Sequence, residues 1–360
     1  MSGQGHMPFE YRPDFEEARR HWAAFWRGEI IDRPCARIVA PKDGMEPGPH
    51  PPGLRHPTDD LRAHVRAYDS WASRMYFAGD AIPFFLPNFG PDLFAAFVGA
   101  DLMGFSAAEN TSWAKPFIED WKTDAVEMDR PQGYWWDAAL DYCKLAAEIG
   151  EGKFGVAGFD LHSNLDCLAA ARGPQRLCMD MIDCPDDVEA ALDRVRRAFA
   201  PVYNGLYEAG QMQRTGTSSW LSFYCEGKYA PVQCDFMCMI SPEHARRFVF
   251  PAIEEEAAFL DHCCLHYDGP DALVHLDDVL ALKGVDAIQW VPGAGNAPLI
   301  EWMELLKKVQ DSGKSLHICC TAEELKVFHR ELRPEKVVYD VWASSQTEAD
   351  GILSWLKSNT

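Results

Sequence analysis

Short apolar segments that alternate with amphipathic helical segments constrain the fold of this chain more than any other feature. Eight segments are predicted to be strands: 35–40, 81–86, 153–158, 218–223, 263–268, 286–291, 315–320 and 336–342. Such short apolar runs are typical of parallel strands that are buried on both faces. Helices between successive strands favour either a closed barrel or an open doubly wound sheet. Because no G-x-G-x-x-G or G-x-x-x-x-G-K-[ST] motif follows the first strands, we expect a (β/α)8 TIM barrel with Val337–Val341 beside Cys35–Val39.

The remaining segments complete this barrel. Ser241 and Pro242 open a helical segment as N-cap and first residue, and Ser345 with Glu348 fits a capping box. Region 87–152 is predicted to be an insertion of helices and loops after the second strand. The proline-rich stretch 41–57 is predicted to be a loop that crosses the barrel surface or covers its mouth. Residues 1–7 are interpreted as a tag or disordered start, and residues 8–360 as one domain.

The charge balance argues against two classes of partner. The chain carries 55 acidic and 34 basic residues, a formal net charge of −21 at pH 7. This negative field repels phosphate backbones and anionic lipids, so we expect neither nucleic acid nor a membrane as a partner. No apolar run approaches the ~20 residues that span a bilayer, and no signal peptide is recognisable. The 12 cysteines are therefore interpreted as reduced thiols of a cytoplasmic protein.

Polar residues follow most of the predicted strands, where a barrel carries its chemistry. We expect an enzyme or a specific binder of a small molecule, because converging buried polar groups are costly unless they are paired. Asp160, Tyr224, Glu226, His266, Asp268 and Gln289 are predicted to line one cavity. The candidate catalytic residues are Glu226, His162 and Asp160, and the candidate substrate-binding residues are Tyr224, Asn88, Gln289, Trp290 and Lys228.

His266 and Asp268 form the sharpest local pattern, because residues two apart on a strand point to the same side. They are predicted either to bind one divalent metal or to form a hydrogen-bonded clamp. Cys319 and Cys320 are further candidate ligands, and only one of these neighbours can face the barrel axis. Imidazole, thiolate and carboxylate together suit zinc. His162 with Asp160 or Asp166 is a second candidate acid–base cluster; the alternative is a helix N-cap formed by Asn164 with its neighbours.

Two later segments carry a family resemblance: CDFMCMISPEHARRFVFPAIEEEAAFLD and CLHYDGPDALVHLDDVLALKGVDAIQWVPGAG. They resemble the uroporphyrinogen decarboxylase-like superfamily, in the branch near the cobalamin-dependent (corrinoid-dependent) methyltransferases. The resemblance implies zinc held by an H-x-C pair and a later cysteine. His266 matches the histidine, Asp268 stands where the first cysteine is expected, and Trp342 and Ala343 stand near the second. These departures argue against thiol methylation and leave methoxy or methylamine donors open.

Three functions remain open from the sequence. The first is transfer of a methyl group from a small methylated substrate to a corrinoid on a partner protein, with Glu226 or His162 as acid. The second is a metal-assisted lyase or hydrolase, including a decarboxylase, that acts on a polar small molecule. The third is a non-catalytic sensor of a small ligand. Barrels of this kind often pair, so a homodimer is one expected assembly.

Overall fold

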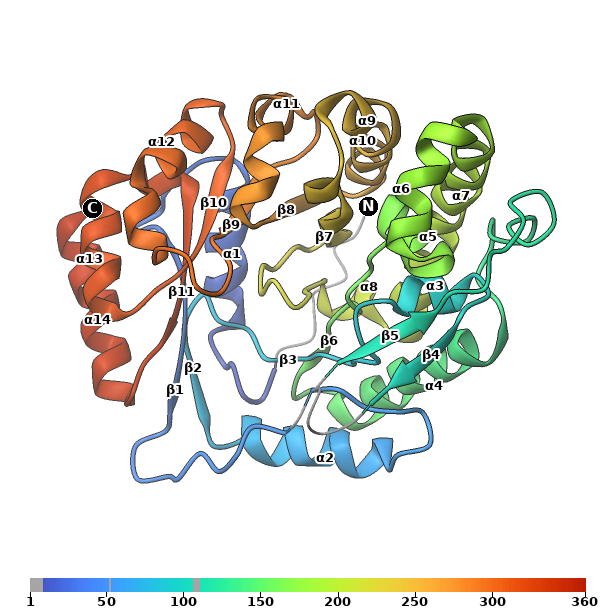
Figure 1. Cartoon of the computed structure of the whole chain (residues 1–360). Coiled ribbons are helices and arrows are strands. Elements are labelled where there is room, and N and C mark those ends of the chain that lie inside the picture. Colours follow the sequence, from blue (N-terminus) through green and yellow to red (C-terminus); the bar gives the residue numbers. More distant parts are fainter. Residues whose placement is uncertain (1–8, 52, 106–110) are drawn as a thin grey trace, which may run out of the picture.

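A seven-stranded sheet forms the centre of the structure, a computed structural model that describes residues 9–51, 53–105 and 111–360 (Figure 1). The interpretation of residues 1–7 therefore lies outside the described residues. The strand order is β2-β1-β11-β10-β9-β8-β7. All neighbours are parallel except β1 and β2. The strands are β1 (Cys35–Pro41), β2 (Met75–Gly79), β7 (Tyr229–Val232), β8 (His262–Asp268), β9 (Ala287–Val291), β10 (Ser315–Cys319) and β11 (Val337–Trp342).

The first and last strands of the predicted barrel are neighbours. β1 pairs with β11 from Cys35 opposite Val338 to Val39 opposite Trp342, which confirms that prediction. β3 (Phe84–Phe85) pairs in parallel with β6 (Gly155–Val156) in a separate small sheet. Among the described residues, the hydrogen-bonded pairs do not join these two sheets into one ring. A mixed α/β fold with a central parallel sheet is therefore established, and the closed barrel stays a prediction.

The predicted fourth strand, 218–223, is wrong. Residues 218–223 form no strand; an isolated bridge pairs the flanking residues Thr217 and Cys225, and the strand at this place in the chain is β7. Leu221 and Phe223 are apolar because they are buried against α1, and not because they belong to a sheet. In Figure 1 the yellow segment that leads into β7 lies inside the curve of the strands.

Helices cover the outer side of the sheet, as α12, α13 and α14 do beside β10, β11 and β1 in Figure 1. The region between β3 and β6 contains two of the helices and the antiparallel hairpin β4 (Asp101–Gly104) and β5 (Ser112–Lys115), which was not predicted. No helix in the described ranges is both long and apolar enough to cross a membrane. The helices are α1 (Phe15–Trp26), α2 (Leu61–Ala72), α3 (Leu93–Phe97), α4 (Gly133–Gly150), α5 (Asn164–Arg172), α6 (Pro174–Asp183), α7 (Pro185–Ala209), α8 (Met212–Thr215), α9 (Pro242–Phe248), α10 (Phe250–Phe259), α11 (Leu276–Ala281), α12 (Met303–Asp311), α13 (Ala322–Glu331) and α14 (Gln346–Asn359).

The two faces of the sheet bury different cores. Successive side chains of a strand point to opposite faces. Ile288, Ile318 and Val341 belong to the large core beneath the outer helices. The alternate residues form an inner core with α1, and its strand members are Cys35, Tyr229, Cys264, Ala287 and Val338. The residue two positions after each of these members lies on the same inner face, nearer the carboxyl end of its strand.

Candidate functional site

A polar layer lies directly above the inner core. This layer consists of the inner-face residues that lie two positions after the strand members of the inner core: Arg37 on β1, His266 on β8, Gln289 on β9 and Asp340 on β11. On β10 the corresponding residue is His317, two positions after Ser315. Because the carboxyl ends of parallel strands meet at one edge, these side chains come together. The sequence puts one polar group on each of five neighbouring strands.

Hydrogen bonds and ion pairs link this layer into a chain. Arg37 Nη1 donates to Asp340 Oδ1 at 2.6 Å. Asp340 Oδ2 lies 3.5 Å from His317 Nε2. The side-chain amide of Gln289 then contacts two imidazoles, with Nε2 at 3.2 Å from His317 Nδ1 and Oε1 at 2.7 Å from His266 Nδ1. Gln289 therefore fixes the ring orientation of both histidines.

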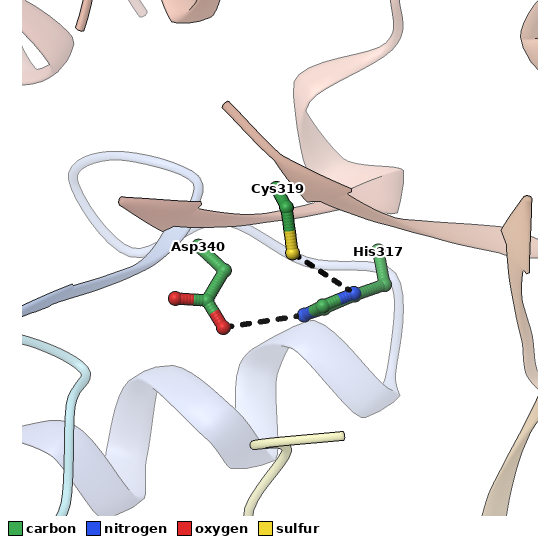
Figure 2. A group of neighbouring side chains, drawn as sticks. All are labelled: His317, Cys319 and Asp340. Carbon is green, nitrogen blue, oxygen red and sulfur yellow. Dashed lines mark hydrogen bonds and ion pairs between the residues drawn. The ribbon is translucent and has the colours of Figure 1, made fainter. Parts of the chain in front are cut away.

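His317, Cys319 and Asp340 form one group of metal-binding character, as Figure 2 shows. One ligand-type atom from each lies within 4.8 Å of the others. His317 is buried, and its Nε2 has no hydrogen-bond partner of good geometry among the described residues. Three protein ligands of nitrogen, sulfur and oxygen leave a fourth position open, which is the pattern of catalytic zinc. These residues therefore fit a zinc ion.

The electrostatics of this group are mutually adjusted. Burial acts to lower the pKa of His317, but Asp340 and Cys319 outweigh it and raise that pKa to about 9. Burial acts to raise the pKa of Asp340. That pKa is nevertheless well below its usual range, because Arg37 and His317 stabilise the carboxylate. Asp340 and Cys319 thus favour a proton on the His317 ring, and a metal bound to the ring would take the place of a proton.

The strand alternation decides between the two adjacent cysteines. Cys319 shares the inner face with His317, and its Sγ lies 4.0 Å from His317 Nδ1. Cys320 packs instead against the large core beneath the outer helices, where burial raises the pKa of its thiol. Cys320 as a ligand is therefore wrong, because it points away from the site.

A second group surrounds His162, in the loop after β6. His162 Nε2 lies 3.2 Å from Asp160 Oδ2, and its Nδ1 lies 3.4 Å from Asp166 Oδ2. Burial opposes the charged ring, but the two carboxylates raise the pKa of His162 well above its usual value. Gln233 Nε2 donates to Asp160 Oδ1 at 2.7 Å. Asn164 is not the N-cap of α5: that position is Ser163, whose side chain makes no capping bond and donates instead to Glu256. Asn164 Nδ2 donates to the Gln233 carbonyl, and its Oδ1 accepts from the Leu165 backbone.

His266 connects the two groups, because it contacts Gln289 and is close enough to Asp160 to affect the pKa of that carboxyl. Burial acts to raise the pKa of Asp160, whereas His162, Gln233 and the charge of His266 lower it. His266 and Asp268 share the inner face of β8 as predicted, but among the described residues neither belongs to a group of three metal-type ligands. Two groups in the described residues have the geometry for a metal: His317, Cys319 and Asp340, two strands away from the predicted pair, and His162, Asp166 and Asp235. The first group combines nitrogen, sulfur and oxygen donors, whereas the second offers one nitrogen and two carboxylates.

Three predicted residues lie elsewhere. Glu226 and Lys228 precede β7, so they lie at the amino ends of the strands, where Glu226 accepts hydrogen bonds from Arg19. Tyr224 and Glu226 line a different cavity, of about 280 Å³, together with His262 at the start of β8. The prediction of one cavity containing Glu226, Tyr224 and His266 is wrong, because it rested on the misplaced fourth strand.

Two other candidates have structural contacts. Trp290 lies on the outer face of β9, one residue after Gln289, and packs against Tyr267 and Trp302, away from the polar layer. Asn88 Oδ1 accepts a hydrogen bond from the Gly90 backbone at 2.7 Å and so fixes the turn after β3.

An aromatic cavity of about 190 Å³ adjoins the polar layer. Arg37 lines it and also binds Asp340. Trp220 lines it and contacts the His266 ring edge-on, with centroids 5.0 Å apart. His50 and Gly53 belong to the proline-rich loop and line the same cavity, so this loop covers it.

The sequence interpretation missed His317, Asp340 and Arg37 as site residues. His317 could have been found from the sequence, because His317-Ile318-Cys319 is an H-x-C pair on one predicted strand. Asp340 and Arg37 had no motif of their own, since only the pairing of β11 with β10 and β1 brings them beside His317.

Comparisons with known proteins support the fold. No protein-family model matches the chain, and no curated protein matches it. A solved structure described as a methyltransferase from Methanosarcina mazei is similar, with a TM-score of 0.60 and 13% sequence identity. The match covers 95% of this chain and 98% of that one. At this identity the likeness is one of fold, and it extends over nearly the whole chain.

Proposed function

We propose that the chain is a metal-assisted methyltransferase built on a (β/α)8 barrel. It moves a methyl group from a small methoxy or methylamine compound to a corrinoid held by a partner protein. The observation that carries this proposal is the convergence of His317, Cys319 and Asp340 at the carboxyl ends of the strands, where Asp340 binds Arg37, a residue that lines the aromatic cavity. The fold likeness to a solved methyltransferase agrees with it.

The residues around the metal group have distinct tasks. Zinc is the ion that this donor set favours, and when bound it supplies a Lewis acid that makes the heteroatom a better leaving group. Arg37 holds Asp340 through a bond of 2.6 Å and balances its charge. Gln289 fixes the orientation of the His317 ring through its side-chain amide.

His162 is the proton donor in this proposal. Two carboxylates keep its ring protonated, and the leaving heteroatom needs a proton once the methyl group has departed. The cavity of about 190 Å³ holds a small substrate and excludes a corrinoid, so the acceptor approaches from outside the cavity. This geometry separates the donor and acceptor sides of the reaction.

Metal content and methyl transfer test the proposal together. Purified wild type should bind one zinc per chain and methylate cob(I)alamin with a methoxy or methylamine donor. Cys319→Ala should lose metal and activity, whereas Cys320→Ala, the matched change one residue away, should keep both. Equal metal content in the two variants would remove the zinc assignment. Zinc-loaded protein that produces no methylcobalamin with any donor would remove methyl transfer.

The lyase alternative also has a specific observation in its favour. His162, Asp160 and Asp166 form a charged acid–base group that chemistry without an acceptor can use. Under this alternative, a polar substrate is consumed in the absence of any corrinoid, and His162→Gln abolishes that consumption. Strict dependence on the corrinoid excludes it.

A further inference from the structure

The aromatic cavity has a lining that selects for one class of ligand. Its walls include Tyr68, Trp71, Phe77, Phe84 and Phe85, and the rings of Tyr68 pack on those of Trp71 and Phe85 with centroids 5.6 and 5.4 Å apart. Aromatic rings pair favourably at such separations. A flat ring can continue this arrangement, whereas a small aliphatic molecule would leave most of the aromatic surface unused.

The charge of the lining argues against a cationic ligand. In a chain of net charge −21, the described residues that line this cavity include no aspartate or glutamate, while Arg37 supplies a guanidinium. An ammonium group would lie near that positive charge without a carboxylate to balance it. An anionic or oxygen-bearing group, in contrast, matches a guanidinium that still has free donors beyond its bond to Asp340.

Two further polar atoms at the cavity lack partners. The Ser219 hydroxyl and the Trp220 indole nitrogen are buried, and among the described residues neither has a hydrogen-bond partner. Buried polar groups are almost always paired in folded proteins. Both residues line the cavity, but these two atoms are covered from it, so the case for an oxygen substituent rests on Arg37.

The volume limits the ligand to one ring. An apolar cavity of roughly 150 Å³ accommodates benzene. At about 190 Å³, this cavity has room for one ring with small substituents and none for a tetrapyrrole. Its polar end lies at Arg37, directly beside the Asp340 member of the metal group.

We propose that this cavity binds a single planar aromatic ring with an oxygen substituent directed to Arg37. This identification of the substrate class rests on the proposed function: the methyl donor is then a methoxy-substituted aromatic acid and not a methylamine. The aromatic walls hold the ring and Arg37 holds its carboxylate, so a methoxy group on the adjacent ring carbon lies next to His317, Cys319 and Asp340. A methoxybenzoate with its methoxy group elsewhere, such as 4-methoxybenzoate, probes recognition of the ring and the carboxylate alone.

Calorimetric titration of the full chain, with no corrinoid present, tests the binding step alone. The probes are 4-methoxybenzoate, methoxybenzene and methylammonium. We expect 4-methoxybenzoate to bind at one per chain, methoxybenzene to bind more weakly, and methylammonium not to bind. Arg37→Gln should weaken 4-methoxybenzoate binding by about 10- to 100-fold, the effect of losing a hydrogen bond to a charged group, with little change for methoxybenzene.

Two more variants complete the experiment. Ser222→Trp fills the cavity and should abolish binding of both aromatic probes. Arg62→Gln removes an arginine from the outer surface of α2, where it pairs with Glu148, and should leave binding unchanged. Circular dichroism checks that each variant is folded.

The outcomes separate this inference from the proposed function. Tighter binding of methylammonium than of 4-methoxybenzoate overturns the aromatic assignment, as does unchanged binding in folded Ser222→Trp. If methylamine drives methyl transfer while no aromatic probe binds, only this inference fails. If 4-methoxybenzoate binds as expected but no donor is demethylated, only the methyl-transfer proposal fails.

Discussion

Glu256, on α10, is a fully buried carboxyl group whose protonation controls stability. Its Oε1 accepts a hydrogen bond from Ser163 Oγ at 2.5 Å, and its Oε2 has no partner among the described residues. Burial, the largest effect, raises the pKa of Glu256 from 4.5 to about 8. The group is therefore protonated in the folded protein at neutral pH and ionised in the unfolded chain.

The size of the effect follows from the two pKa values. Between pH 4.5 and 8 the unfolded chain binds fewer protons at this site than the folded protein, so stability falls as the pH rises. Each pKa unit is worth about 1.4 kcal/mol, so the separation of about 3.5 units amounts to roughly 5 kcal/mol across this range. The contribution is fully present below pH 4.5 and is lost as the pH passes 8.

Glu256→Gln isolates this contribution, because glutamine keeps the shape and the acceptor oxygen but does not titrate. In urea unfolding from pH 5 to pH 9, the free energy of unfolding of the variant should rise relative to that of wild type by several kcal/mol as the pH increases. The control is Glu255→Gln, an exposed neighbour that accepts a bond of 2.8 Å from Arg196 and should change stability by less than about 1 kcal/mol at any pH. A difference between Glu256→Gln and wild type that stays flat with pH would refute the reasoning.

Three further predictions concern the stability of the fold and the metal group. Asp80→Ala leaves Arg33 buried without its partner, 2.5 Å away, and should lower the free energy of unfolding by about 3–5 kcal/mol in urea titrations. Asp340→Asn should weaken zinc binding by more than about 10-fold in competition with a chromophoric chelator, since even outer partners of a metal contribute that much. Gly216→Ala should lower the melting temperature, because φ is +78° there and the added Cβ would lie 2.4 Å from the Tyr224 ring.

The strands that sequence identified well are the ones buried on both faces. β1, β8, β9, β10 and β11 agree with the predicted segments within one or two residues. The fourth strand was misplaced for two physical reasons. The segment around Phe223 is apolar because it fills the interior beside α1, and β7 itself contains Pro231, which cannot donate a backbone hydrogen bond.

Site residues could be predicted from sequence where their position depends on one strand alone. They could not be predicted where their position depends on how two strands pair. His266, Gln289 and Cys319 were identified because each ends an apolar strand on its inner face. Glu226 was misassigned because its position relative to the sheet depended on the wrong fourth strand. Asp340 could not be recognised from sequence, since its role depends on the register that sets it beside Arg37 and Cys319.

The polar layer is difficult to explain as a device for stability. Arg37, Asp340 and His317 could be replaced by apolar side chains that extend the inner core by one layer, and buried ion pairs rarely stabilise a fold more than such packing does. The structure instead keeps the His317 ring, the Arg37 guanidinium and the Asp340 carboxylate side by side. His317 Nε2 is buried 3.5 Å from Asp340, without a hydrogen bond of good geometry among the described residues. A shift of one residue along β9 and β10 would exchange Gln289 for Trp290 and Cys319 for Cys320 and would remove the layer. The same alternation that builds the core therefore also sets His317 and Cys319 on one face, and the metal and substrate that we propose would account for charges that the fold alone does not need.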